Sequence, residues 1–248
     1  MSDNGRMNDD EQELAQNCYG YGRWDAPYWF IGLEEGQPKW ENNNFTKRTA
    51  VFRRLNKAGL CDCLEFHKEI GEPRWHLMNP KTGRVDGQST WKYLILLLMA
   101  FQETPMDDEH LENILRNYQC NRWGKCDGTG ETCVIELSGL PANNSEVSKK
   151  RPEETRKQIE LIRPTRIKSI QNNLLRYRPE FVVMYGATEK ECWRKIAGIT
   201  LQPGIPQKVG STTFLMALHP TAHFRKGQKK NPYWIDLGTR LRAESVRS

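Results

Sequence analysis

Two glutamates and a histidine in this chain stand directly after short apolar runs. Glu34 and Glu35 follow the run 28–33, and His219 follows the run 212–218, nearly the whole chain away. Each run is rich in apolar residues and ends at polar or turn residues, which predicts a short buried strand. Ligands of open parallel sheets bind just beyond the carboxyl ends of strands. We therefore expect two carboxylates and an imidazole to meet in one crevice.

The two glutamates lie between Gly32 and Gly36. Glycines permit a tight turn and the close approach of backbone to a ligand. A buried carboxylate without a partner is costly, so at least one of the two should face the crevice. There it could orient or activate a water, or stabilise a developing positive charge. The alternative is a solvated turn with two surface acids.

His219 is followed by Pro220, which ends the strand. A histidine in this place can donate a hydrogen bond to an oxygen that gains negative charge as a bond breaks. Losing one such donor costs about 3 kcal/mol in the barrier. Thr221 or a free backbone N–H could hold a phosphate. The alternative is a histidine satisfied by the local backbone.

A basic segment follows, and the whole chain carries a net charge of +6. Lysines and arginines here would neutralise phosphates. Phe224 or Arg225 could wedge into a base stack. A solvated surface loop is the alternative. The candidate DNA-binding residues are Thr221, His223, Phe224, Arg225, Lys226, Lys229 and Lys230.

Glu136 interrupts a third apolar run, 133–137, near its end. An unpaired carboxylate is expensive there, which indicates a ligand or a partner.

The order of elements predicts an α/β fold with parallel strands and helices on both faces. Residues 1–10 are expected to be a flexible tail, and 11–248 a single domain with an irregular insertion at 61–87. The expected strands are 28–33, 133–137, 181–185 and 212–218. The expected helices are 11–18, 46–59, 89–102, 107–118, 151–178 (broken at Pro164), 188–197 and 231–242.

The composition indicates a cytoplasmic protein. The N-terminus has no apolar signal-peptide core, and the longest apolar run, 93–101, is far shorter than the roughly 20 residues that span a bilayer. Of the seven cysteines, Cys120, Cys126 and Cys133 form a loose series that could contribute metal ligands, but reduced cytosolic thiols are favoured. We expect no metal, no cofactor, no membrane and no obligatory protein partner.

Together these segments resemble the uracil-DNA glycosylase superfamily. Residues 32–36 look like its first motif, Gly-x-(Asp/Asn/Ala)-Pro-(Gly/Tyr/Ala), and residues 219–221 look like its His-Pro-Ser motif. Residues 179–186 resemble the strand between them, and 135–137 occupy the place of the strand that reads the flipped base. The resemblance extends over residues 28–241, with 61–87 as an extra.

The resemblance implies a three-layer α/β/α sandwich with a central four-stranded parallel sheet. It also implies flipping of a base out of DNA and hydrolysis of its N-glycosidic bond, as in DNA repair. Glu34 would orient the water and stabilise the cationic sugar, and His219 would hold the oxygen of the departing base. Phe45, or else Trp40, would stack on the base, and the loop after His219 would fill the gap left in the DNA.

Two departures from the family pattern bear on the substrate. Glu35 replaces the usual proline, so either glutamate could act. Glu136 stands near the asparagine of uracil-specific members, and a carboxylate only accepts hydrogen bonds unless it is protonated. Cytosine offers an exocyclic amine that a carboxylate can accept from. Glu136 could instead lie one residue out of register, or pair with an arginine such as Arg122.

The resulting hypothesis is removal of a modified pyrimidine. Relatives in the superfamily include an anti-phage glycosylase that removes glucosylated hydroxymethylcytosine from viral DNA. An ordinary uracil-DNA glycosylase and an inert nucleic-acid-binding member are the alternatives. The four-cysteine iron–sulfur pattern of some members is absent from the sequence.

Overall fold

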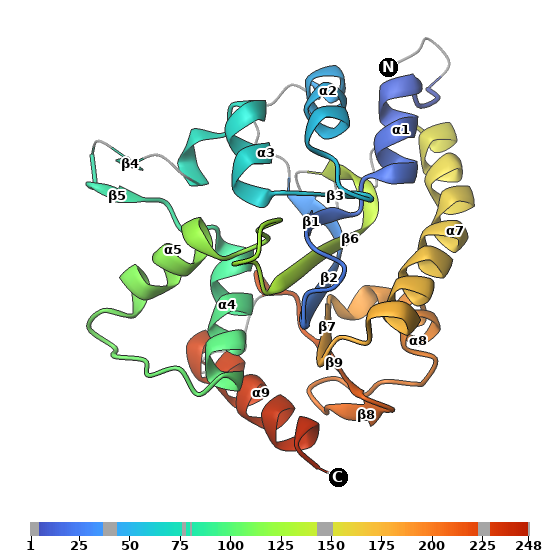
Figure 1. Ribbon diagram of the computed structural model, residues 1–248. Coiled ribbons are helices and arrows are strands. Elements are labelled where there is room, and N and C mark those ends of the chain that lie inside the picture. Colours follow the sequence, from blue (N-terminus) through green and yellow to red (C-terminus); the bar gives the residue numbers. More distant parts are fainter. Residues whose placement is uncertain are drawn as a thin grey trace.

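The computed structural model describes residues 5–36, 44–75, 78–79, 81–142, 151–222 and 229–247. A seven-stranded sheet runs through the molecule in the order β3-β1-β6-β2-β7-β9-β8 (Figure 1). Its strands are β1 (Gly20–Gly22), β2 (Tyr28–Gly36), β3 (Leu60–Cys61), β6 (Thr132–Ala142), β7 (Phe181–Tyr185), β8 (Gln207–Val209) and β9 (Thr212–Ala217). A separate two-stranded ribbon pairs β4 (Met78–Asn79) with β5 (Arg84–Val85).

The four strands expected from the sequence occupy the middle of the sheet. β6, β2, β7 and β9 are mutually parallel. However, β1 pairs antiparallel to β6, and β8 pairs antiparallel to β9. The expectation of a four-stranded parallel sheet is therefore wrong for the whole sheet, which is mixed and wider. The added strands are only two or three residues long, too short to show a period in the sequence.

Strand β1 was not predicted from the sequence, because it contains glycines, which usually weaken a strand. Gly20 and Gly22 have positive φ angles of 134° and 94°. A Cβ atom on either would come within 2.1 Å of a β6 carbonyl oxygen, that of Val134 or of Thr132. Glycine is thus required for β1 to approach β6.

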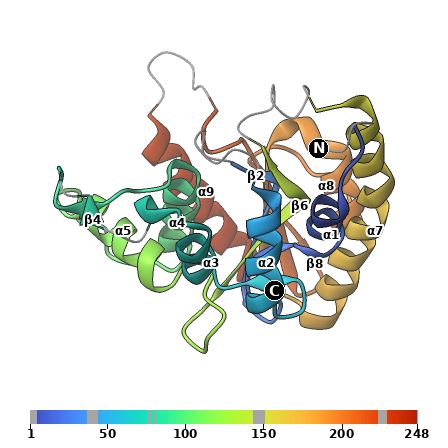
Figure 2. The ribbon, with the colours of Figure 1, turned by 90° about the horizontal axis from the view of Figure 1, so that it is seen from above.

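Helices cover both faces of the sheet (Figure 2). Alternate residues of the strands point to opposite sides, and the buried residues form two apolar clusters accordingly. Trp29 and Ile31 pack with α7 (Glu153–Tyr177) and α8 (Lys190–Ala197). Phe30 packs on the other side with α4 (Ser89–Phe101) and α9 (Lys230–Ser245). The remaining helices are α1 (Asp9–Asn17), α2 (Phe45–Leu55), α3 (Cys63–Ile70) and α5 (Leu111–Asn121), with 3-10 turns at Pro73–Trp75 and Ala187–Glu189.

The segment 61–87, expected to be irregular, contains helix α3. Asp62 caps its start by accepting a hydrogen bond from the backbone N–H of Glu65, and Gly71 ends it in the left-handed conformation. These are ordinary helix signals, and the buried residues of α3 join the main core.

The break expected at Pro164 is also wrong, because α7 is one helix with the proline inside it. Proline has no N–H for the carbonyl four residues earlier, that of Glu160. Pro164 and Glu160 are both exposed, so water can satisfy that carbonyl.

Residues just before position 11 already pack against the rest of the protein. Met7 is buried, and its backbone N–H donates to Gln158. Asn8 and Glu11 form a capping box at the start of α1. Residues 7–10 therefore do not behave as the tail expected over 1–10. Within the described parts of the chain, no helix has the length and apolar character needed to cross a membrane.

Candidate functional site

One row of residues crosses the sheet near the carboxyl ends of its parallel strands. Glu136 on β6 is directly opposite Gly32 on β2. On β7, Tyr185 follows Met184, the partner of Ile31, and is itself paired with Ala217 at the end of β9. The glutamates of β2 and His219 after β9 extend from this row at the same edge. The acids and the histidine thus follow parallel strands at one edge of the sheet, and their meeting in one crevice stays a prediction.

Within the described residues, Glu136 has a hydrogen-bond partner for one of its two carboxyl oxygens. It is 8% exposed, and the Tyr185 hydroxyl donates to its Oε1 over 3.5 Å. Its Oε2 is buried and has no hydrogen-bond partner among the residues that the structure describes. Burial, and then the nearby Glu35 and Glu34, raise the pKa of Glu136 well above its usual value. Burial and the neighbouring acids thus favour the protonated form of Glu136, which can both donate and accept.

The alternative that Glu136 pairs with Arg122 is wrong, since Arg122 pairs with Glu131 at 3.5 Å. Arg166, which is fully buried, acts on this carboxyl group only through its charge, which opposes the rise in the Glu136 pKa. It donates instead to backbone carbonyls, including those of Glu136 at 2.6 Å and Leu137 at 2.8 Å. This fixes the backbone of β6 while Oε2 remains unpartnered.

Gly32 makes room for Tyr185. A Cβ at position 32 would lie 2.4 Å from the Tyr185 hydroxyl oxygen. The absence of a side chain therefore allows Tyr185 to reach across β2 toward Glu136. The Tyr185 ring lies in turn 5.7 Å from the His219 ring, centre to centre. Tyr185 was not singled out from the sequence, although its place at the end of an expected strand pointed to this edge.

Glu35 is fixed by three side chains. Its carboxylate accepts from the Tyr21 hydroxyl at 2.8 Å, from Arg48 at 3.1 and 3.3 Å, and contacts Nε2 of His67 at 3.1 Å. Burial acts to raise its pKa, but the Arg48 charge and the hydrogen bonds from His67 and Arg48 outweigh it and lower the pKa strongly. Glu35 is thus held ionised by a complete set of donors.

His67 and Cys63 do not make this cluster a nucleophilic triad. Nδ1 of His67 lies 2.7 Å from the carbonyl oxygen of Cys63 and 3.8 Å from its sulfur. The thiol is buried, and burial raises its pKa well above the usual value. The cluster is therefore best explained as an anchor that ties β2 to α2 and α3.

Glu34 contacts a different part of the molecule. It forms an ion pair with Arg151 at 3.3 Å, and each side chain is 10% exposed. Arg151 also donates to the carbonyl oxygens of Leu140 at 3.1 Å and Pro141 at 2.7 Å, at the end of β6. A cavity of about 140 Å³ adjoins Glu34 and is lined also by Ser138 and Arg156. Glu34 therefore borders open space, whereas Glu35 is enclosed by its partners.

His219 has a defined tautomer. Its Nδ1 lies 2.8 Å from the Thr221 hydroxyl and 3.2 Å from the Thr221 backbone N. A backbone N–H can only donate, so Nδ1 is the acceptor and the proton of the neutral ring is on Nε2. His219 is exposed at this edge. Partial desolvation and then the Lys230 charge lower its pKa. The neutral ring therefore presents an N–H donor.

The structure describes some of the other residues predicted from the sequence to form the site. Phe45 is the first residue of α2 and only 8% exposed, so little of its ring is available to stack on a base. Lys229 precedes α9, and Lys230 lies 5.5 Å from the Tyr93 ring centre. Trp40, His223, Phe224, Arg225 and Lys226 lie outside the described residues.

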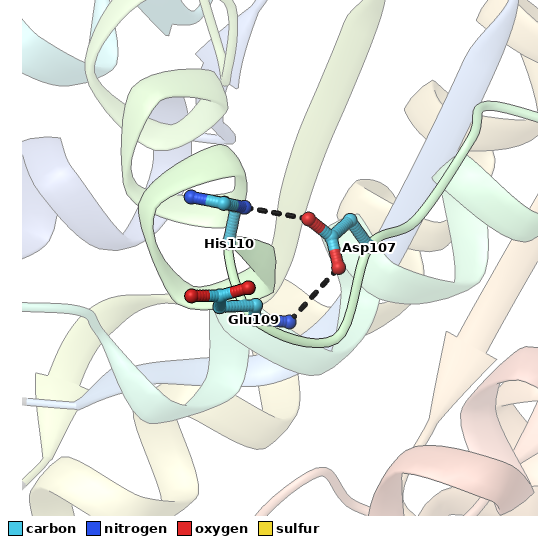
Figure 3. A group of neighbouring side chains, drawn as sticks. All are labelled: Asp107, Glu109 and His110. Atoms are coloured by element: carbon cyan, nitrogen blue, oxygen red, sulfur yellow. Dashed lines mark hydrogen bonds and ion pairs between the residues drawn. The ribbon is translucent and has the colours of Figure 1, made fainter.

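The cysteines of the loose series make separate contacts. Cys126 donates to the carbonyl of Gly22, Cys120 approaches that of Trp75, and Cys133 is buried in β6. Within the described residues, the metal-ligand types come together in threes only at Asp107, Glu109 and His110 (Figure 3). There Asp107 binds the His110 ring and the Glu109 backbone N–H, as an exposed turn before α5 would do without any ion.

A comparison with models of known protein families gives no match, and a comparison with curated proteins gives none either.

Proposed function

We propose that this protein is a DNA glycosylase that flips a modified pyrimidine out of DNA and hydrolyses its N-glycosidic bond. The observation that carries the proposal is the buried Glu136 carboxyl group with its unpartnered Oε2. Such a group is costly in a structural role. It is explained if a ligand completes its hydrogen bonds at the sheet edge where α/β folds bind ligands.

A neutral carboxyl group presents a donor and an acceptor side by side. Cytosine offers the matching pair: its ring N3 accepts the O–H, and its exocyclic amine donates to the carbonyl oxygen. Uracil can form a similar pair through O4 and N3–H. The surrounding acids Glu34 and Glu35 favour the amine of cytosine over the partly negative O4 of uracil. A cytosine-type base is thus the first candidate and uracil the second.

The other residues of the row suit the chemistry of this reaction. As the bond between the sugar C1′ and the base N1 breaks, its electron pair leaves with the base. Glu34 would stabilise the positive sugar, orient a water toward C1′ and accept a proton from it. The neutral His219, donating from Nε2, would hold the base oxygen that gains negative charge. The fixed position of Glu35 favours Glu34 as the glutamate that acts.

The test is release of free base from DNA. Oligonucleotides would contain uracil, hydroxymethylcytosine or glucosylated hydroxymethylcytosine, each assayed with the wild type, Glu34→Gln and the exposed control Glu191→Gln. We expect release of a modified cytosine by the wild type and the control, and retained DNA binding without release by Glu34→Gln. Release of uracil alone would support the repair alternative, and binding without any release would support the inert one.

A further inference from the structure

A groove opens at the opposite edge of the sheet from the row of acids. It lies between the C-terminal half of α7, the end of α8 and the turn from β8 into β9, and its volume is about 640 Å³. The groove is lined by Thr212, the first residue of β9, whereas His219 comes two residues after the end of this strand. At about 3.3 Å per residue, the length of β9 separates Thr212 from His219 by roughly 20 Å. A partner bound in the groove would leave free the edge of the sheet at which we propose that DNA binds.

Two apolar side chains of the groove, Leu175 and Val209, are exposed. The floor beneath them is formed by the buried Leu174, Ile196 and Phe214. Leu175 is 73% exposed. Exposed apolar side chains set beside a recess and rimmed by polar residues are a feature of peptide-docking grooves.

The charges of the groove have one sign. Lys168 and Arg178 line it, and its lining contains no acidic residue. Across the described parts of the chain, neither cation is joined to an acid in an ion pair, although many other surface cations are. An occupant with carboxylates beside apolar side chains would therefore match both features.

We propose that this groove docks an acidic, amphipathic peptide segment of another protein. Such a segment lays its apolar face into a groove and directs its charges to the rim. DNA fits less well, because two cations neutralise few phosphates and the apolar lining would meet none of its charged surface. The inference is independent of the glycosylase proposal.

Fluorescence anisotropy with designed peptides tests the proposal. One labelled helix of about four turns carries leucines at positions i, i+3, i+4 and i+7 with glutamates elsewhere. A second has the same composition in scrambled order, and a third has lysines in place of glutamates. We expect binding of the first and at least about tenfold weaker binding of the other two.

Variants locate the binding. Leu175→Ser and Arg178→Glu should each weaken binding of the acidic peptide at least about fivefold. Leu161→Ser is the matched control for the first, because Leu161 is 78% exposed on the same helix but outside the groove. Lys190→Glu, on the exposed start of α8, is the charge control for the second. Both controls should retain binding.

The four substituted side chains are exposed, and circular dichroism would verify that each variant is folded. Equal losses in groove and control variants would overturn the proposal, as would equal affinity for the scrambled peptide. If the protein forms a dimer and Leu175→Ser abolishes it, the groove binds a second copy of the chain, and the proposal would be overturned. Loss of DNA binding in the groove variants would overturn it too.

Discussion

The Tyr185 hydroxyl and Oε1 of Glu136 lie 3.5 Å apart, and this long contact is the hydrogen bond that the described residues offer to the Glu136 carboxyl group. A contact of this length is weak. A buried carboxyl group with so weak a partner is unfavourable for stability.

Replacing Glu136 by Gln should stabilise the protein at neutral and alkaline pH. The pKa of Glu136 is raised in the folded state, so its contribution is most favourable below the unfolded value of about 4.3 and is lost as the pH rises. We expect Glu136→Gln to gain about 1–3 kcal/mol at pH 8 and little at pH 4. Urea unfolding across this range would measure the difference. Equal gains at both pH values would contradict a raised pKa.

The same position should set base preference. Glu136→Asn retains a donor and an acceptor but fixes which atom is which. We expect the ratio of kcat/KM between cytosine-type and uracil substrates to change at least about tenfold. An unchanged ratio would show that Glu136 does not contact the base.

Arg151 should act on catalysis through Glu34. Removing the Arg151 guanidinium, 3.3 Å from the Glu34 carboxylate, takes away a nearby positive charge that favours the ionised carboxylate. Arg151→Met should therefore lower base release about tenfold or more and move the acid limb of the pH profile to higher pH. In a double-mutant cycle, the variant that carries both Arg151→Met and Glu34→Gln should release base no more slowly than Glu34→Gln alone.

Arg156→Met is the matched control for this prediction, because Arg156 lines the same cavity. If the two effects multiply, Arg151 acts independently of Glu34. A nuclear magnetic resonance titration of the Glu34 carboxyl group would test the coupling even in the absence of turnover.

The sequence predicted the central strands and the edge at which the acids meet, because apolar runs ending at polar residues are local signals. It could not predict the partners that separate the roles of Glu34 and Glu35. Arg151 is 117 residues from Glu34, and His67 is 32 residues from Glu35. Such pairings depend on how the sheet and helices close, which no spacing within one segment reveals.

The protonation state of Glu136 could not be predicted from the sequence either. Glu136 as a residue type indicates an acceptor, whereas its burial beside two other acids favours the protonated form, which donates as well. The glycines of β1 show a similar limit. Gly20 and Gly22 count against a strand locally, yet the approach to β6 requires them.

Replacing Glu35 by Gln should destabilise the protein and leave Arg48 and His67 buried without their anion. Breaking a buried ion pair costs about 3–5 kcal/mol. The pKa of Glu35 is lowered in the folded state, so its stabilisation is present above about pH 4.3 and is lost as the pH falls further. The difference between wild type and Glu35→Gln should shrink accordingly in acid unfolding. A variant that unfolds like the wild type but releases no base would instead assign Glu35 to catalysis.

Lys229 and Lys230 should contribute to DNA affinity through phosphates. Replacing both by Gln should reduce the slope of log K against log salt by up to about 2, with weaker binding mainly at low salt. Filter binding at several salt concentrations would measure the slope. Lys208→Gln, in strand β8, is the control, and an equal loss there would indicate a general effect of net charge.

His219 should act as a neutral donor. His219→Ala removes it and should lower kcat about 100- to 1000-fold while DNA binding changes little. Because Lys230 helps to lower the pKa of His219, Lys230→Met should raise that pKa, and protonation of the ring would begin at higher pH. Protonation removes the Nδ1 acceptor of the Thr221 backbone N–H and so disturbs the ring's position. The acid limb of base release should therefore move to higher pH in Lys230→Met and stay in place in Lys229→Met, and identical profiles for the two variants would exclude this role of Lys230.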